Sequence, residues 1–287
     1  MATLALVVHH DREEAAALAI EAVAWLAARG HRVRLPADDA VLLDLKELAC
    51  DDAMLARGVD VAVAIGGDGT MLRAVRLVAD LDVPVLGINA GQLGYLTETD
   101  PADWESALDR LLTGSYALDE RMLLHVAIDA PSGVAGDLGT HLVLNEAVLE
   151  KCSMGHTARL RVCIDGRFFT SYVADGLIVA TATGSTAYAL SARGPIVAPN
   201  LWALLLTPVS PHMLFDRTLV LEPSTELRLE VDGGRPANLS VDGQHLVTLA
   251  DGDAIVCTAA ERPARLVSFG RRDFHGILKS KFGLNDR

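Results

Sequence analysis

Apolar runs and helical periodicities alternate along the first hundred residues of the chain. Residues 3–8 form a continuous apolar run of the β type, and residues 13–29 then carry apolar side chains at helical spacing. A second run, 59–65, is apolar at nearly every position, as expected for a parallel strand buried on both faces. A helical segment over 71–78 and a strand over 83–88 follow. This alternation predicts an open parallel sheet with helices packed on it.

Beyond about residue 120 the pattern changes to short alternating segments separated by turns, several of them marked by Asp-Gly pairs. The segments cover 123–129, 141–149, 159–164, 176–180, 219–221, 226–231 and 246–249. We therefore predict an α/β N-terminal domain with an open parallel sheet over 1–120 and a C-terminal all-β, sandwich-like domain over 121–267. A short helix in the tail, 268–287, is expected to return to the first domain.

The composition and net charge of the chain limit the kinds of partner that it is expected to bind. The 287 residues are 51% hydrophobic, which is ample for folded cores, and the formal net charge is −13. An acidic chain is not expected to bind nucleic acid or an anionic membrane surface. The start of the chain lacks the features of a signal peptide, so a cytoplasmic location is expected. The four cysteines show no metal-binding spacing, and we predict no resident metal site.

The sequence Gly66-Gly67-Asp68-Gly69-Thr70 follows directly on the second apolar run. Glycines let phosphate oxygens approach backbone N–H groups, and the helix after the turn offers its N-terminus to an anion. Such a turn lies at the carboxyl end of a parallel strand, where open α/β sheets bind ligands. We predict that these residues form a phosphate-binding loop, although it matches neither the Rossmann fingerprint nor the Walker A loop.

Asp68 is the unusual member of this loop, because a carboxylate repels phosphate unless it has a chemical task. Accepting a proton from a hydroxyl nucleophile is one such task, and helping to hold a divalent cation is the other. Arg73, about one helical turn further on, could face the same phosphates. The simpler alternative is a turn in which Asp68 caps the helix. His9 and His10 follow the first strand and could lie at the same edge of the sheet.

Two polar segments stand out in the second half. Asn145-Glu146 follows an apolar stretch, and both side chains could bind a ribose diol, although a solvated strand end is the alternative. Residues 181–188 crowd five hydroxyl side chains around Gly184 and end in the aromatic ring of Tyr188. This segment could hold the sugar and base of a nucleotide. A hairpin with one polar face is the simpler interpretation.

Taken in order, these motifs resemble those of the bacterial-type NAD kinases over nearly the whole chain. The matching segments are Gly66-Gly67-Asp68-Gly69-Thr70, Gly87-Ile88-Asn89, Gly94-Tyr95-Leu96-Thr97, Asn145-Glu146, Asp175-Gly176, Thr183-Gly184-Ser185-Thr186-Ala187-Tyr188, Gly194-Pro195, Ser210-Pro211-His212 and Asp242-Gly243-Gln244. The glycine-rich motif alone is shared with lipid kinases and phosphofructokinases. The ordered set is far more specific.

The resemblance implies phosphorylation of the adenosine ribose 2′-hydroxyl of NAD by ATP, or by polyphosphate in some members, giving NADP and ADP. Mg²⁺ or another divalent cation would accompany ATP, and the protein would be a homodimer or homotetramer. Asp68 would be the proton acceptor. The substrate-binding residues implied by the resemblance are Gly69, Arg73, Asn145, Glu146, His156, Asp175, Thr186, Ala187, Tyr188, Ser191 and Gln244.

The chain departs from the family pattern at four positions. Ala182 replaces a proline, Arg193 replaces the first glycine of Gly-Gly-Pro, and Ala90 stands where a larger side chain is common. Val173 is apolar where some members carry arginine, which leaves the choice between NAD and NADH open. None of these changes removes a reacting group.

Two other functions fit part of the pattern. A lipid kinase of the wider superfamily would explain the glycine-rich motif but not Asn145-Glu146, and it predicts a membrane-docking face that this acidic chain lacks. A nucleotide-binding regulator would explain the pocket but not the retention of Asp68. Four basic residues near the end of the chain could bind ATP phosphates, contact a second subunit or form a solvated helix face: Arg271, Arg272, Lys279 and Lys281.

Overall fold

The computed structural model describes residues 1–91, 94–134, 138–270 and 273–284. The chain folds into two compact units, of which unit 1 comprises 1–120 and 264–287 and unit 2 comprises 121–263. Among the described residues, no helix is long and apolar enough to cross a membrane.

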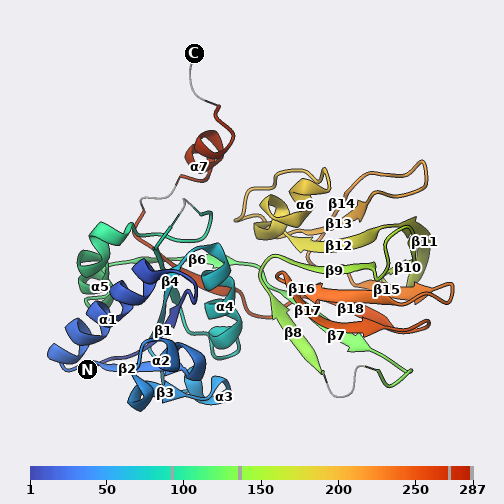
Figure 1. Ribbon diagram of the computed structural model, residues 1–287. Coiled ribbons are helices and arrows are strands. Elements are labelled where there is room, and N and C mark those ends of the chain that lie inside the picture. The colour runs from blue at the N-terminus through green and yellow to red at the C-terminus, as the bar shows by residue number, and fades with distance from the viewer. Residues whose placement is uncertain (92–93, 135–137, 271–272, 285–287) are drawn as a thin grey trace. The chain divides into compact units, whose positions relative to one another are not determined.

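A seven-stranded sheet forms the centre of unit 1, in the order β3-β2-β1-β4-β5-β19-β6 (Figure 1). Its strands are β1 (Thr3–Val8), β2 (Arg32–Pro36), β3 (Ala49–Cys50), β4 (Val61–Gly66), β5 (Val85–Asn89), β6 (Ala117–Arg121) and β19 (Ala264–Ser268). The pairings from β3 through to β19 are parallel. Because β1 lies between β2 and β4, the order of the strands reverses there. In such sheets the carboxyl ends of the two central strands form the usual ligand site.

Helices cover both faces of this sheet. On one face α1 (Glu13–Ala28) and α5 (Trp104–Leu112) share a core cluster with Leu4, Leu6 and Val8 of β1. Helix α4 (Asp68–Val78) packs on the other face (Figure 1). The packing is so close that a Cβ atom on Gly87 of β5 would lie 2.7 Å from Sδ of Met71. The remaining helical segments are α2 (Ala37–Leu42), η1 (Lys46–Leu48), α3 (Asp52–Leu55), η2 (Ala79–Leu81), η3 (Pro101–Asp103) and α7 (Phe274–Lys281).

Unit 2 consists of two six-stranded sheets, whose paired strands run antiparallel. One sheet has the order β11-β10-β15-β18-β7-β8, with β7 (Leu124–Asp129), β8 (Thr140–Val143), β10 (Ala158–Ile164), β11 (Arg167–Ala174), β15 (Leu227–Asp232) and β18 (Ala254–Ala259). The other has the order β14-β13-β12-β9-β16-β17, with β9 (Glu146–Lys151), β12 (Gly176–Thr181), β13 (Leu204–Val209), β14 (Leu219–Leu221), β16 (Ala237–Val241) and β17 (Gln244–Leu249).

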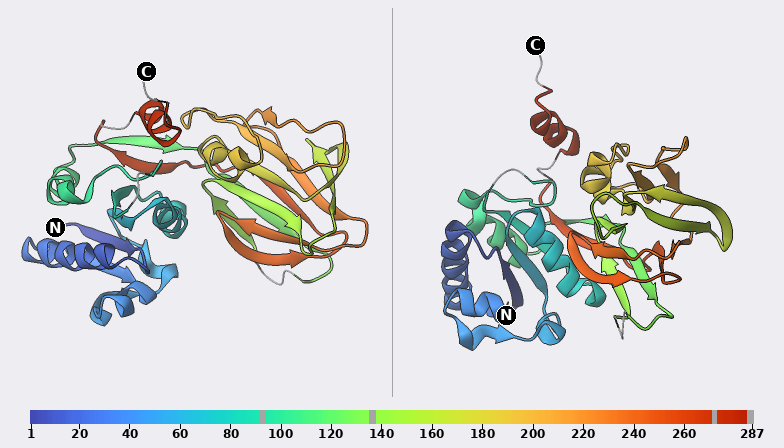
Figure 2. Two further views of the ribbon diagram at one scale, coloured as in Figure 1. Left: turned by 45° about the horizontal axis from the view of Figure 1, so that its top comes forward. Right: turned by 45° about the vertical axis from the view of Figure 1, so that its right-hand side comes forward.

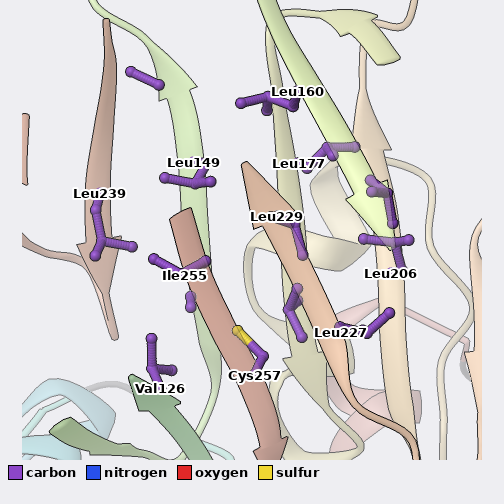
Figure 3. Close-up of a cluster of buried hydrophobic side chains, with 14 of the residues drawn as sticks. Val126, Leu149, Leu160, Leu177, Leu206, Leu227, Leu229, Leu239, Ile255 and Cys257 are labelled. Carbon is purple, nitrogen blue, oxygen red and sulfur yellow. The ribbon is translucent and has the colours of Figure 1, made fainter. Parts of the chain in front are cut away.

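The core of unit 2 lies between these sheets, which form separate layers (Figure 2). Leu149 and Leu177 from one sheet share a buried cluster with Leu229 and Ile255 from the other (Figure 3). The short helical segments η4 (Thr183–Thr186) and α6 (Tyr188–Ser191) follow β12 directly.

The predicted fold class is confirmed, since an α/β unit with a parallel-rich sheet is joined to antiparallel β sheets. Two details differ from the sequence expectation. The segment 141–149 is two strands, β8 and β9, which belong to different sheets and separate at Leu144-Asn145. The last β strand, β19, joins the sheet of unit 1 from Ala264 on, slightly before the predicted boundary at 267.

Candidate active site

The glycine-rich turn connects the buried strand β4 to helix α4. Gly66 ends the strand, Gly67 has extended backbone angles, and the helix begins at Asp68. A Cβ atom on Gly66 would lie 2.2 Å from Oγ1 of Thr70, so only glycine fits there. The exposed Gly69 places no side chain over the first turn of the helix. The N-terminus of α4 can therefore receive an anion.

The Asp68 carboxylate is fixed by the chain segment that follows β5. The N–H of Tyr95 donates to Oδ2 at 2.7 Å, and the N–H of Leu96 donates to Oδ1 at 2.8 Å. Each oxygen keeps a further lone pair, so the carboxylate can still accept a proton. Burial and the negative charge of Asp68 both raise the pKa of the Tyr95 phenol. Asp68 is thus an oriented carboxylate at the start of a helix, beside a phenol that stays neutral.

The tail of the chain contacts this region of unit 1. The aromatic ring of Phe274 in α7 lies 6.3 Å from that of Tyr95, measured between ring centroids, and Nζ of Lys281 lies 4.6 Å from the Tyr95 ring centroid. Of the four basic residues singled out in the tail, Arg271 and Arg272 lie outside the described residues.

Arg73 points from α4 to the end of strand β1. Its guanidinium donates to both carboxylate oxygens of Asp39, over 2.5 and 3.2 Å, and to the carbonyl oxygen of Val8 at 3.3 Å. Nε2 of His10 lies 2.7 Å from Oδ1 of Asp39, which is completely buried. Arg73 and His10 therefore share one buried carboxylate beside the carboxyl end of β1. No pattern in the sequence indicated Asp39, which lies in the short helix α2.

In unit 2, the segment Asn145-Glu146 lies where the chain passes from β8 to β9. The carboxylate of Asp242 accepts hydrogen bonds from the backbone N–H groups of Leu144, Asn145 and Glu146, over 2.9, 2.7 and 3.2 Å. In the sequence, Asp242 was noted as part of an Asp-Gly turn and of the family-matching segment Asp242-Gly243-Gln244, without a role of its own. The structure shows that it organises the backbone that carries Asn145 and Glu146.

Glu146 is a buried acid, with 6% of its surface exposed, and its Oε2 accepts no hydrogen bond from the described part of the chain. Burial, followed by the nearby charge of Asp242, raises the pKa of Glu146 to about 7. A hydrogen bond from the backbone N–H of Tyr188 lowers this pKa in part. At neutral pH the group is divided between its acid and carboxylate forms, and so can both donate to and accept from a hydroxyl.

The segment after β12 packs directly on Asn145. The N–H of Thr181 donates to the carbonyl oxygen of Asn145 at 2.9 Å, and Oγ1 of Thr181 donates to the carbonyl oxygen of Leu144 at 2.6 Å. A Cβ atom on Gly184 would lie 2.1 Å from the Asn145 carbonyl oxygen. Glycine is therefore required at 184, and the two polar segments of unit 2 lie in direct contact.

The structure changes the role of two of the five hydroxyl groups in this segment. Oγ1 of Thr181 donates to the carbonyl oxygen of Leu144. Oγ of Ser185 accepts a hydrogen bond from the N–H of Val197 at 3.0 Å and donates to the carbonyl oxygen of the same residue at 3.2 Å. These two hydroxyls fix the turn and are not free to bind a nucleotide, because backbone groups buried beside them need partners. Thr186, Ala187 and Tyr188 remain at least partly exposed.

A cavity of about 620 Å³ opens beside α6, with Tyr188, Ser191 and Arg193 among its lining residues. Its size is that of a small-molecule site. Arg193 has φ of 66°, in the left-handed region that favours glycine, and this explains why the family pattern has glycine at that position. Burial and the negative charges of Glu150, Asp175 and Glu146 raise the pKa of the Tyr188 phenol.

The other predicted contact residues lie around the same unit. Asp175 precedes β12 and accepts a hydrogen bond from Nζ of Lys151 at 2.5 Å. Lys151 was not singled out in the sequence. Its neighbour Glu150 pairs with Gly176 in the sheet, and this register places Lys151 beside Asp175. Gln244 is exposed at the start of β17, next to the Asp242-Gly243 turn, and His156 is exposed between β9 and β10.

The residues that the structure describes contain no group of three or more His, Cys, Asp or Glu side chains that could hold a metal ion. All four cysteines are free thiols.

Comparisons with known proteins match both units of the chain to domains of the same family. Two family models match it, the ATP-NAD kinase N-terminal domain over residues 4–116 and the ATP-NAD kinase C-terminal domain over 144–269. An NAD kinase of Moorella thermoacetica is 39% identical over 284 residues, which cover 98% of this chain and 89% of that protein. An NAD kinase of Symbiobacterium thermophilum is 39% identical over 282 residues, covering 98% and 99%.

Solved structures show the same fold. The crystal structure of yeast NADH kinase complexed with NADH matches with a TM-score of 0.89 at 25% identity, covering all of this chain and 89% of that one. An NAD kinase from Archaeoglobus fulgidus in complex with ATP matches with a TM-score of 0.71 at 24% identity, covering 99% and 98%.

Proposed function

The chain belongs to the ATP-NAD kinase family, and we propose that it transfers the γ-phosphoryl group of ATP to the 2′-hydroxyl of the adenosine ribose of NAD, giving NADP and ADP. The observation that carries this proposal is the oriented carboxylate of Asp68 inside a glycine-rich turn. A carboxylate is unfavourable beside phosphate, so its presence there requires a chemical task. Proton acceptance from the attacking hydroxyl is that task.

Unit 1 would bind the phosphates of the donor. Gly66, Gly67, Gly69 and Thr70 would form the phosphate-binding turn at the start of α4, where the helix dipole favours negative charge. The N–H of Thr70 itself donates to the carbonyl oxygen of Gly67 at 3.1 Å and so stabilises the turn. Mg²⁺, or another divalent cation, would arrive bound to the ATP phosphates as part of the substrate. Polyphosphate carries the same phosphoryl chemistry and is the alternative donor.

Arg73 would add positive charge to the same region. Its pairing with Asp39 engages both terminal nitrogens and partly neutralises the guanidinium. We therefore assign Arg73 a weaker role at the phosphates than an unpaired arginine would have, because a paired cation attracts a further anion less strongly.

Asp68 would act late in the reaction. A ribose hydroxyl is a very weak acid, so a carboxylate cannot remove its proton before the phosphorus–oxygen bond begins to form. As that bond forms, the hydroxyl proton becomes acidic and passes to a carboxylate oxygen. Phosphoryl transfer otherwise depends on holding the acceptor oxygen in line with the γ-phosphorus and on neutralising phosphate charge.

Unit 2 would bind NAD. Asn145 and Glu146 would hold the ribose hydroxyls, since one is an amide and the other a buried acid with an unused oxygen. Asp175 would contact the base or the carboxamide, and Tyr188 offers a ring on which a base can stack. The further proposed NAD contacts are Thr186, Ala187, Ser191, His156 and Gln244.

The test is a coupled assay of the purified protein with Mg²⁺-ATP and NAD, in which an NADP-specific dehydrogenase reports NADP. We expect NADP to form, and parallel reactions with NADH and with polyphosphate measure the acceptor and donor range. Folded protein that binds NAD without forming NADP would favour the regulator. Phosphorylation of a lipid hydroxyl in place of NAD would favour the lipid kinase.

A homodimer or homotetramer is also proposed, on the family resemblance alone, and light scattering of the purified protein measures it directly. The cytoplasmic location stays a prediction from sequence.

A further inference from the structure

Asp242 makes contacts that a hairpin turn does not need. It lies between β16 and β17 with φ of 44°, a left-handed conformation that aspartate and asparagine tolerate. Its carboxylate reaches three backbone N–H groups, of Leu144, Asn145 and Glu146, which are 98, 97 and 96 residues away along the chain. Its own N–H donates to the carbonyl oxygen of Glu146 at 3.0 Å.

A second Asp-Gly turn in unit 2 shows which contacts the aspartate of such a turn needs. Asp165, before Gly166 in the turn between β10 and β11, has φ of 50°, and its own N–H also donates to a distant carbonyl oxygen, that of Glu226, at 2.9 Å. Its carboxylate, however, accepts one hydrogen bond, from the N–H of Glu226 at 2.9 Å, where that of Asp242 accepts three. The same type of turn therefore forms at Asp165 although its carboxylate does not accept hydrogen bonds from several N–H groups of a distant segment. The additional contacts of Asp242 require another explanation.

The geometry around Asp242 supplies that explanation. The N–H groups that it fixes belong to the residues that carry the side chains of Asn145 and Glu146, and Gln244 follows two residues later on the same hairpin. On the opposite side, Thr181 holds the carbonyl oxygens of Leu144 and Asn145. The backbone at this point is therefore held from both sides, although it is the junction of two sheets.

We propose that Asp242 is a positioning residue for NAD, which fixes the backbone of Leu144, Asn145 and Glu146 so that the side chains of Asn145 and Glu146 meet the ribose. This inference rests on the proposed function, in which those two side chains hold the ribose hydroxyls. Asp242 acts through them and is not itself assigned a contact with the substrate.

The charge of Asp242 gives this role a second measurable consequence. The groups that face Glu146 are Asp242 from the β16–β17 turn and Tyr188 from α6, which donates its backbone N–H to Glu146 and whose phenol is affected by the charge of Glu146. After burial, Asp242 is the larger cause of the raised pKa of Glu146. Loss of the Asp242 charge therefore lowers the pH at which Glu146 loses its proton. If Glu146 binds the ribose, the pH at which NAD affinity changes moves down with it.

The experiment compares Asp242→Asn with the matched control Asp165→Asn. Asparagine keeps the left-handed turn in both, but at 242 it places an amide NH₂ against N–H donors. We measure the Kd of NAD by calorimetry as a function of pH, and the KM of ATP in the coupled assay. Asp242→Asn should weaken NAD binding about tenfold and leave the KM of ATP within about twofold. The midpoint of the pH dependence should fall. Asp165→Asn should change none of these.

Three results would overturn the inference: NAD affinity unchanged in Asp242→Asn, equal losses for NAD and ATP, or an unchanged pH midpoint. If Asp242→Asn does not fold, Glu146→Gln serves instead, since it should abolish the pH dependence of NAD binding, and a persisting dependence counts against the inference. Failure of the proposed function itself is seen separately, because the unmodified protein would then form no NADP in the same assay.

Discussion

The Asp68 carboxylate occupies the space in which a side chain at Gly94 would begin. A Cβ atom at position 94 would lie 2.1 Å from Oδ1 of Asp68 and 2.8 Å from its Cγ. The glycine therefore lets the next two residues, Tyr95 and Leu96, bring their N–H groups to the carboxylate. The segment after β5 thus sets the orientation of the proposed base, although it lies more than twenty residues further along the chain.

Gly94→Ala should consequently displace the Asp68 carboxylate. Misplacement of a reacting group by about 1 Å can reduce turnover on the order of 10²-fold, and we expect a loss of kcat of that order. The Kd of NAD, measured by calorimetry, should stay within about twofold, because the proposed NAD contacts belong to unit 2. Normal turnover in Gly94→Ala would show that the orientation of Asp68 does not matter.

Glu146 should make stability depend on pH. Its pKa is 4.5 in an ordinary environment and about 7 in the folded protein, so the folded state holds the proton more strongly than the unfolded chain. The free energy of unfolding should therefore fall as pH rises from 4.5 to about 7, by about 3 kcal/mol in total. Glu146→Gln removes the ionisation and should be more stable than the unmodified protein above pH 7, but not near pH 4.5.

Urea denaturation of the two proteins near pH 4.5 and above pH 7 measures this difference in the free energy of unfolding. The exposed Glu261→Gln is the matched control and should change stability by less than about 0.5 kcal/mol at either pH. A stabilisation by Glu146→Gln of equal size at both pH values would contradict a titration of Glu146 in this range.

The buried carboxylate of Asp39 should be important for the stability of unit 1. Asp39→Ala leaves Arg73, His10 and the N–H of Val8 without this acceptor. Removing one member of a buried ion pair typically costs about 3–5 kcal/mol, and we expect a loss of that size in urea denaturation. The neighbouring Asp38→Ala, at an exposed position of the same helix, should cost less than about 0.5 kcal/mol. Equal effects of the two substitutions would contradict this assignment.

Ala182 offers a stabilising substitution. Its φ is −59°, close to the value that a proline ring imposes. Ala182→Pro restores the residue of the family pattern and should stabilise the protein by about 0.4–1 kcal/mol, because it restricts the unfolded chain. The melting temperature reports the change, and a decrease would mean that the local backbone does not accept proline.

Local patterns were sufficient to predict the fold class. The apolar run over 3–8 is strand β1, and the helix expected over 13–29 is α1, because burial imposes its period directly on the sequence. The helix predicted over 71–78 begins earlier, at Asp68, since glycines that suit a tight turn do not show a helical period. Strand β19 was not predicted, because a single strand that returns to a distant sheet has no local signal.

The contacts that organise the candidate site could not be predicted in the same way. Asp39 and Arg73 are 34 residues apart, and Asp242 and Leu144 are 98 apart. Neither pair has a spacing that reflects its contact. Asp-Gly at 242–243 correctly indicated a hairpin, but the same signal at 165–166 has no comparable set of contacts. Only the folded chain distinguishes these two aspartates.

The most direct test of the proposed mechanism is the turnover of Asp68→Asn in the coupled assay with Mg²⁺-ATP and NAD. The substitution keeps the size of the side chain but removes the proton acceptor, and we expect kcat to fall by a factor on the order of 10² or more. The Kd of NAD should stay unchanged, which shows that the variant still binds its substrate. Turnover equal to that of the unmodified protein would contradict the assignment of Asp68 as the base.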